Sequence, residues 1–169
     1  MIKPRTKVPS LVVDLINGTQ WKLSNQHPEN YTLIVFYRGV HCPVCKKYLE
    51  ELTEKLQDFI DRGVHVIAIS SDSEERAKRS VDEWNITALP LGFNLSIKKG
   101  REWGLFISKG ISEKEPEEFT EPGVFLIKSD GTLYFSAIQT MPFARPNFEE
   151  ILSAIDFVQK KNYPARGES

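Results

Sequence analysis

Two cysteines, Cys42 and Cys45, are the residues whose types and spacing point most directly to chemistry. They are the only cysteines among 169 residues, and they form a C-x-x-C motif within HCPVCKKYLEEL. Such a pair can bind a metal, form a structural disulfide, or cycle between a dithiol and a disulfide. The residues around the motif favour one of these roles.

Cys42 lies where an apolar run, YTLIVFY (31–37), gives way to a predicted helix that begins near Pro43. Proline suits the first position of a helix, because its missing N–H has no intrahelical partner there. The free N–H groups and the dipole at this end of a helix stabilise negative charge. We therefore expect the pKa of Cys42 to lie below the free-thiol value of about 8.5. Arg38 and His41 precede it and favour the thiolate further, so Cys42 is the predicted attacking thiol.

Cys45 follows one helical turn later, where side chains three residues apart approach within disulfide reach. It also continues an apolar stripe with Leu49, Leu52 and Leu56, which predicts that it is the more buried of the two cysteines. An exposed attacking thiol beside a recessed resolving thiol is the arrangement that thiol–disulfide exchange requires. We expect mild oxidation to join the two in an intramolecular disulfide.

The other roles of a C-x-x-C motif fit this sequence less well. A disulfide between residues three apart closes a very short loop and is worth only roughly 2 kcal/mol as a structural staple. A zinc site needs three or four protein ligands, but there is no second C-x-x-C and there are only three histidines, His27, His41 and His65. No metal site is therefore predicted. Two inert cysteines that serve as small core residues remain an alternative.

Composition sets the wider bounds. The formal net charge is −1, and the hydrophobic and charged fractions, 40% and 27%, are ordinary for one soluble globular domain. This balance gives no reason to expect nucleic acid or an anionic membrane as a partner, and no apolar run is long enough to span a bilayer. The start of the chain lacks the apolar segment of an export signal. With so few cysteines, a reducing, cytoplasmic location is the prediction.

Strand and helix patterns alternate along the chain. A hairpin is predicted around Asn17-Gly18, and a second one joins GVFLIK to TLYFSAI. The other predicted strands are 31–37 and 64–70, with a strand-like LPLGF at 89–93. Helices are predicted at 43–61, from SDSEER (71–76), which supplies the cap and early carboxylates, through Ala77, Val81 and Trp84, before Trp103, and at 147–161. Residues 107–121 are predicted to be a charged insertion outside the core, and 162–169 a loose tail. We expect a single layered α/β domain over residues 1–169.

An ordered set of motifs resembles the alkyl hydroperoxide reductase/thiol-specific antioxidant family, the peroxiredoxin-like branch of the thioredoxin superfamily. The similarity is to members that carry a C-x-x-C, and it runs from about Pro9 to Gln159. The motifs are IVFYRGVHCPVCKKYLEEL, AISSD, WNITALPL, GVFLIKSDGTL and RPNFEEIL. The resemblance implies a thioredoxin-like fold with a mixed central sheet, helices on both faces and a peroxiredoxin-type N-terminal hairpin. It implies an antioxidant oxidoreductase that needs no cofactor.

The sequence departs from the family pattern at the reaction centre. Typical peroxiredoxins read F-Y-P-x-x-x-T-x-x-C, and counting from Tyr37 places the peroxide-attacking cysteine at Cys45. Cys42 then takes the place of the threonine, and Arg38 that of the proline. The arginine that typical members carry just before a later strand is replaced by Pro122, where thioredoxins have a cis-proline that shapes the partner-binding surface.

The residues therefore fit two reactions, for which Cys42 and Cys45 are the predicted catalytic residues. The expected supporting or substrate-binding residues are Arg38, Gly39, His41, Pro43 and Pro122. In thiol–disulfide exchange, which we favour from the sequence, Cys42 attacks a substrate disulfide and Cys45 resolves the mixed disulfide. In a thiol peroxidase, one cysteine is oxidised to a sulfenic acid and the other condenses with it. The missing threonine and strand arginine weaken that alternative, although Arg38 or Arg145 could supply a substitute charge.

A third hypothesis is a non-catalytic binding module that kept the fold. For an active enzyme, the expected partners are a dithiol reductant protein or a small thiol, and the expected substrate is a disulfide or a hydroperoxide. A homodimer is a further possibility.

Overall fold

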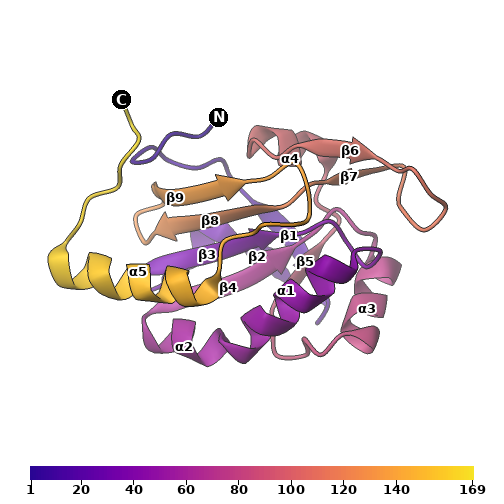
Figure 1. Cartoon of the computed structure of the whole chain (residues 1–169), viewed down its shortest axis with the longest axis horizontal. Coiled ribbons are helices and arrows are strands. Elements are labelled where there is room, and N and C mark those ends of the chain that lie inside the picture. The colour runs from indigo at the N-terminus through magenta and orange to yellow at the C-terminus, as the bar shows by residue number, and fades with distance from the viewer.

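The computed structural model describes all 169 residues and is built around one seven-stranded mixed sheet (Figure 1). The strand order is β2-β1-β5-β4-β3-β8-β9, and β6 and β7 form a separate two-stranded sheet. The strands are β1 (Val12–Leu15), β2 (Gln20–Lys22), β3 (Tyr31–Phe36), β4 (Val64–Ile69), β5 (Leu91–Phe93), β6 (Ile107–Lys109), β7 (Glu118–Thr120), β8 (Gly123–Lys128) and β9 (Leu133–Ile138). The helices are α1 (Pro43–Glu54), α2 (Leu56–Asp61), α3 (Glu74–Glu83), α4 (Ile97–Glu102) and α5 (Phe148–Lys161), with a 3-10 turn at Leu23–Asn25.

The central strand β3 explains why its sequence is almost wholly apolar. It pairs in parallel with β4 and antiparallel with β8, and all six of its residues are buried. A strand with partners on both edges and layers on both faces has no solvent side, so its residues need not alternate in polarity. Because β3 lies at the middle of the sheet, the turn that follows it emerges between β4 and β8.

Helices cover both faces of the sheet. Leu33, Val35 and Tyr37 point into a core that also contains residues of α1, α2, α3 and α5. Ile34 and Phe36 point into the opposite core, which includes Trp103 directly after α4. Figure 1 shows α5, α2, α1 and α3 along the lower side of the sheet, and α4 with β6 and β7 at the upper side. The predicted mixed sheet, helices on both faces and N-terminal β1–β2 hairpin are confirmed.

Two segments differ from the sequence-based prediction. The helix expected over 43–61 is divided at Lys55, whose N–H contacts the carbonyls of Glu51, Leu52 and Thr53 and so closes α1 before α2 begins. The charged insertion at 107–121 contains the β6–β7 hairpin, and its last residues, Phe119, Thr120 and Glu121, are buried rather than outside the core. The hairpin folds back against α4, so part of a charged segment enters the interior.

The tail, residues 162–169, has no regular secondary structure after Asn162 ends α5. It is nevertheless attached to the rest of the chain. The Tyr134 hydroxyl donates to the Tyr163 carbonyl at 2.9 Å, Glu168 pairs with Arg5 at 2.9 Å, and Ala165 is buried. None of the helices has the length and apolar character that crossing a bilayer requires.

Candidate active site

The turn after β3 is shaped by a glycine and a buried carboxylate. Gly39 has a φ of +141°, and a Cβ at this position would lie 2.5 Å from Oδ1 of Asp72. The other oxygen of Asp72 accepts a hydrogen bond from the Val40 N–H at 2.8 Å, and the Cys42 N–H donates to the Gly39 carbonyl at 3.1 Å. The predicted involvement of Gly39 thus has a structural cause: only glycine lets the chain turn this closely around Asp72 and into α1.

Cys42 is the N-cap of α1, and Pro43 is the first helical residue, both as predicted. The Cys45 N–H donates to the Cys42 Sγ at 3.2 Å, so the sulfur satisfies one of the free donors at the start of the helix. The two cysteines are one turn apart, and both are free thiols. The sequence therefore places a thiol where backbone N–H groups and the helix dipole favour its ionised form.

Cys45 is the more buried of the two cysteines, as predicted, but the expected exposure of Cys42 is wrong. Cys42 is only 2% exposed and Cys45 is 0% exposed, and both belong to the larger core. Sequence reasoning placed Cys42 at the surface because thiol–disulfide exchange requires an exposed attacking thiol. In the fold, a distant segment brings Arg145 against Cys45 and Pro146 against Tyr48, and Cys42 belongs to the same core.

The pKa values of the two thiols are shifted in opposite directions. The hydrogen bond from the Cys45 thiol is the largest cause that lowers the pKa of Cys42 to about 6, against the effect of burial. The Cys45 N–H and the charges of Arg145 and Arg38 act in the same direction as that hydrogen bond. Burial raises the pKa of Cys45, and the hydrogen bond that it donates to Cys42 retains its proton. At neutral pH the pair therefore consists of a Cys42 thiolate and a Cys45 thiol.

Arg145, in the connection between β9 and α5, is the cation in direct contact with the pair. Its Nη2 donates to the Cys45 Sγ at 2.9 Å, and its Nε donates to the Pro142 carbonyl at 2.6 Å. The guanidinium lies over the ring of Tyr48, with Cζ 4.9 Å from the ring centroid. The Tyr48 hydroxyl donates to the Pro146 carbonyl at 2.6 Å, so α1 holds this connection on both sides of the arginine.

Arg38 has a different partner. The β3–β8 register pairs Phe36 with Gly123, so its continuation sets Arg38 opposite Glu121. The two side chains form an ion pair, with Nε 3.1 Å from Oε2, and the Ser108 hydroxyl donates to the other Glu121 oxygen at 2.7 Å. The Arg38 guanidinium also stands 4.8 Å from the ring centroid of Phe119. The charged insertion therefore positions one of the predicted site residues.

His41 also contacts Phe119. Its ring is 4.7 Å from that of Phe119, and its Nδ1 is 3.3 Å from Nη2 of Arg76. Burial is the main cause that lowers the pKa of His41; the charges of Arg38 and Arg76 add to it, and Asp72 partly opposes it. At neutral pH the imidazole is therefore uncharged, so its expected role as a positive neighbour of Cys42 is not supported.

Pro122 directly precedes β8, and its carbonyl accepts the Gln139 N–H at 3.0 Å. It lies next to Glu121, the partner of Arg38, and the continued β3–β8 register sets it opposite Tyr37. No peptide bond in the chain is cis. The similarity of Pro122 to the cis-proline of thioredoxins therefore does not extend to its peptide geometry, and the common trans state of an X–Pro bond holds here.

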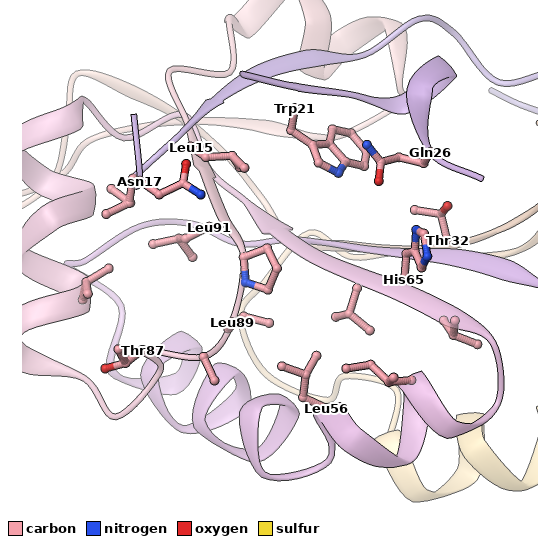
Figure 2. Close-up of a pocket in the computed structure, with 17 residues that line it drawn as sticks. Leu15, Asn17, Trp21, Gln26, Thr32, Leu56, His65, Thr87, Leu89 and Leu91 are labelled. Carbon is pink, nitrogen blue, oxygen red and sulfur yellow. The ribbon is translucent and has the colours of Figure 1, made fainter. Parts of the chain in front are cut away.

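A separate cavity lies at the opposite end of the parallel strands. Figure 2 shows Trp21, Leu56, Leu89 and Leu91 around it, with Thr32 and His65 at one side. Its volume is about 640 Å³, and neither cysteine lines it. Thr32 and His65 belong to the first residues of β3 and β4, whereas the cysteines follow the last residue of β3. This cavity is therefore not part of the candidate active site.

Sequence reasoning missed several residues that hold the site together. Asp72 and Arg76 belong to the segment interpreted as the cap and first turn of α3, and their Oδ1–Nε contact is 3.1 Å. Phe119 and Glu121 were assigned to an insertion outside the core. Arg145 was considered only as a substitute charge. The pairing that sets Arg38 opposite Glu121 joins the distant strands β3 and β8, so the sequence alone gave no signal for it. No group of three or more His, Cys, Asp or Glu side chains is arranged to hold a metal ion.

The sequence profile of the AhpC/TSA family matches residues 4–136, well over half of the chain. The chain belongs to the AhpC/TSA family. One curated relative is a "1-Cys peroxiredoxin" of Dirofilaria immitis, which is 27% identical over 174 residues. The alignment covers 90% of the present chain and 66% of the relative. A second, from Onchocerca volvulus, is also 27% identical and is covered to 64%. The AhpC/TSA chain thus spans about two thirds of the length of these relatives.

Solved structures of low sequence identity share the fold. A mutant of peroxiredoxin 6 of Arenicola marina superposes with a TM-score of 0.81 at 20% identity, over 99% of this AhpC/TSA chain and 80% of that one. AhpC of Mycobacterium tuberculosis gives 0.75 at 14% identity, over 98% and 97%. A putative thiol:disulfide interchange protein DsbE of Chlorobium tepidum gives 0.69 at 18% identity, over 94% and 98%. The fold is therefore common to proteins named for either of the two reactions.

Proposed function

We propose that this AhpC/TSA protein is a thiol-dependent oxidoreductase that reduces hydroperoxides with the Cys42–Cys45 pair. The observation that carries the proposal is the position of the Cys42 Sγ at the start of α1, where it accepts the Cys45 N–H at 3.2 Å and its pKa is lowered to about 6. A thiolate is the nucleophile in thiol chemistry, and here it stands beside a thiol that keeps its proton. The family membership and the printed names of the relatives support the same chemistry.

In the first step, the Cys42 thiolate attacks the terminal oxygen of a hydroperoxide. The O–O bond breaks, the hydroxyl group stays on sulfur as a sulfenic acid, and the alkoxide takes up a proton and leaves as an alcohol. In the second step, the Cys45 sulfur attacks the Cys42 sulfur, the S–O bond breaks, and the hydroxyl leaves as water with the Cys45 proton. One hydroperoxide and two thiols thus become an alcohol, water and a disulfide.

Two arginines serve the two sulfurs. Arg38, fixed by Glu121, and Arg145 both favour the Cys42 thiolate by their charge. Arg145 also donates directly to the Cys45 Sγ. Once Cys42 is a sulfenic acid, the Cys45 proton loses its thiolate acceptor, and the second step needs negative charge to develop on Cys45. A guanidinium at 2.9 Å is placed to stabilise that charge.

Thiol–disulfide exchange is the second candidate, because the two thiols stand one turn apart at a helix start and can form a disulfide without moving α1. The closed site and the trans bond before Pro122 favour a small oxidant over a protein disulfide. Either reaction ends in a disulfide that an external dithiol protein or a small thiol must reduce. A reducing compartment such as the cytoplasm would supply such a partner.

The experiment is a side-by-side turnover assay with cumene hydroperoxide and with a model disulfide, under one dithiol supply. We expect the wild type to consume the hydroperoxide and Cys42→Ser to lose more than about 100-fold of that activity. Cys45→Ser should still consume one equivalent of hydroperoxide and accumulate a trappable sulfenic acid at Cys42. Turnover of the disulfide alone would support exchange instead. Turnover of neither substrate would support a binding module.

A further inference from the structure

The cavity of Figure 2, between β4, the β1–β2 hairpin, α2 and α3, lies beside an edge of β4 that has no strand partner. β4 spans Val64–Ile69, but it pairs with β5 only at Ala68 and Ile69. The first four residues of β4 therefore have a neighbouring strand on one side only, that of β3. Two of these residues, Val64 and Val66, line the cavity.

The hydrogen bonds to β5 show which backbone groups of β4 face this side. Alternate residues of a parallel strand bond to its two neighbours. The N–H groups of Ala68 and Ser70 donate to the carbonyls of Pro90 and Gly92, at 3.0 and 3.1 Å, so the even-numbered residues of this segment face β5. The next even-numbered residue toward the start of β4 is Val66. Its N–H and C=O therefore point toward the cavity, where β5 does not reach.

Pro90 and the turn before it end the ladder between β4 and β5. The same spacing would set the Val66 carbonyl opposite the N–H of residue 90, which a proline lacks. Before Pro90 the chain is in a turn, in which the Leu89 N–H donates to the Ile86 carbonyl at 3.0 Å, and its pairing with β4 starts only at Leu91. Val66 is 7% exposed, so a buried donor and a buried acceptor are left without a strand partner. Such groups are costly unless a water or a ligand satisfies them.

The side chains around this edge set the chemistry of a ligand. None of the lining residues is a Lys, Arg, Asp or Glu, so a charged ligand would be buried without a counter-charge. The volume of about 640 Å³ is that of a small-molecule site. The walls are mainly apolar, with Trp21, Leu56, Ile60, Leu89 and Leu91, and the polar side chains are those of Asn17, Gln26, Thr32, His65 and Thr87.

We propose that this cavity binds a small uncharged molecule that carries an amide-like donor–acceptor pair in an apolar framework, such as a fused-ring lactam. Val64 is also even-numbered, so its carbonyl lies on the same edge as the Val66 N–H. The ligand N–H donates to the Val64 carbonyl and the ligand C=O accepts the Val66 N–H, in place of the missing strand. From Val64 to Val66 the free edge spans about 7 Å, which suits one amide group and is short for a strand of a protein partner.

The site is independent of the reaction proposed for the cysteines. Neither Cys42 nor Cys45 lines the cavity, which lies at the opposite end of the parallel strands. A ligand here therefore does not compete with a hydroperoxide or a disulfide for the thiols. The inference adds a second binding site to the molecule, and it stands or falls separately from the proposed function.

Titration of the ¹⁵N-labelled, reduced full chain with phenanthridinone, an uncharged three-ring lactam, tests this. We expect the Val66 amide resonance to shift on binding, whereas that of Gly39, in the turn before the cysteines, keeps its position. N-methylphenanthridinone has the same rings and carbonyl but no N–H. It should bind at least about fivefold more weakly, because the Val64 carbonyl then stays unpaired.

A cavity-filling variant tests the location. Ala88 is exposed and lines the cavity, so the indole of Ala88→Trp should occupy it and weaken lactam binding by at least about tenfold. Ala154→Trp is the matched control, because Ala154 is an exposed alanine on α5 that does not line this cavity. Its affinity for the lactam should equal that of the wild type.

An unmoved Val66 resonance at about 1 mM lactam would mean that water alone satisfies the edge, and it would overturn the inference. Equal affinities of the two probes would overturn it too, since binding would then not use the unpaired carbonyl. Undiminished binding to a folded Ala88→Trp would place the lactam elsewhere, with the same consequence. If Ala88→Trp does not fold, the Val66 resonance and the comparison of the two probes decide the question on the wild type.

Discussion

Cys42 owes its low pKa mainly to a hydrogen bond from the Cys45 thiol, and this dependence can be measured. In Cys45→Ser the hydroxyl can still donate, so the rate of Cys42 alkylation by iodoacetamide should rise with a midpoint near pH 6. In Cys45→Ala the donor is lost, and the midpoint should move up toward the free-thiol value of about 8.5. A pH series of alkylation rates on the two variants gives both midpoints.

The midpoint is a better readout than the rate at one pH. A thiol with a pKa near 6 is about 90% ionised at pH 7, against about 3% for a pKa of 8.5. The lower pKa also makes the thiolate a weaker nucleophile, which offsets most of this roughly 30-fold gain. A midpoint above pH 8 in Cys45→Ser would contradict the assignment of Cys42 as the thiolate. Equal midpoints in the two variants would show that the helix start, not the side chain at 45, sets the pKa.

Gly39 is the second residue whose replacement has a clear expected cost. In Gly39→Ala the new Cβ would meet Asp72 at 2.5 Å, at a φ of +141°. Gly18→Ala is the matched control, because Gly18 also has a positive φ, +84°, but no atom within 4 Å of the added Cβ. We expect Gly18→Ala to cost about 1 kcal/mol and Gly39→Ala about 2 kcal/mol more, measured by urea denaturation. Equal losses would mean that Asp72 moves aside freely.

The contact between α1 and the connection from β9 to α5, residues 139–147, can be weakened without touching Arg145. Tyr48→Phe keeps the ring under the guanidinium but removes the hydroxyl that donates to the Pro146 carbonyl. A hydrogen bond of this kind is worth about 1 kcal/mol, so the amides of residues 139–147 in the reduced protein should exchange about fivefold faster with solvent. Tyr134→Phe removes a like bond to the Tyr163 carbonyl and should loosen the tail instead. Faster amide exchange of residues 139–147 in both variants would point to general destabilisation.

Local sequence patterns were sufficient for most elements and for part of the site. The apolar run of β3, the Asn17-Gly18 turn and the position of Pro43 each act within a few residues, so the strands and the start of α1 could be predicted. The break at Lys55 could not, because the helical pattern continues through it and only the backbone shows the end of α1. The C-x-x-C motif could be found in the sequence, whereas the side chains that surround it in the fold could not.

Burial of the cysteine pair belongs to the whole molecule, since it depends on segments far apart in the chain. The contact of Arg145 with Cys45 joins residues 100 positions apart, and that of Tyr48 with Pro146 joins residues 98 apart. Asp72 reaches back 32 positions to Val40. No local pattern encodes such pairings, and a turn is expected at the surface unless another segment covers it. Local patterns therefore could not predict that Cys42, expected to be exposed, is buried in the fold.

The same burial links the redox state of the pair to the stability of the whole fold. A Cys42 pKa of about 6 in the folded protein, against about 8.5 when unfolded, means that the ionised thiol stabilises the reduced fold. Because the folded pKa is the lower one, this stabilisation is present near pH 8.5 and is lost as the pH falls through 6. Oxidation to the disulfide removes the titrating thiol altogether.

We therefore expect the free energy of unfolding of the reduced protein, minus that of the oxidised protein, to fall by about 3 kcal/mol between pH 8.5 and pH 5. The Cys45 thiol is also lost on oxidation, but because its pKa is raised it lowers the difference by only about 0.4 kcal/mol at pH 8.5. The remaining titrating groups are common to both forms and largely cancel in the difference. Urea denaturation of both forms at each pH measures it, and in Cys42→Ser the pH dependence of the reduced form should be correspondingly flatter. A structural staple would instead make the oxidised form more stable by a margin of about 2 kcal/mol that does not depend on pH. A constant difference of that sign would show that the pair cross-links the fold rather than reacting.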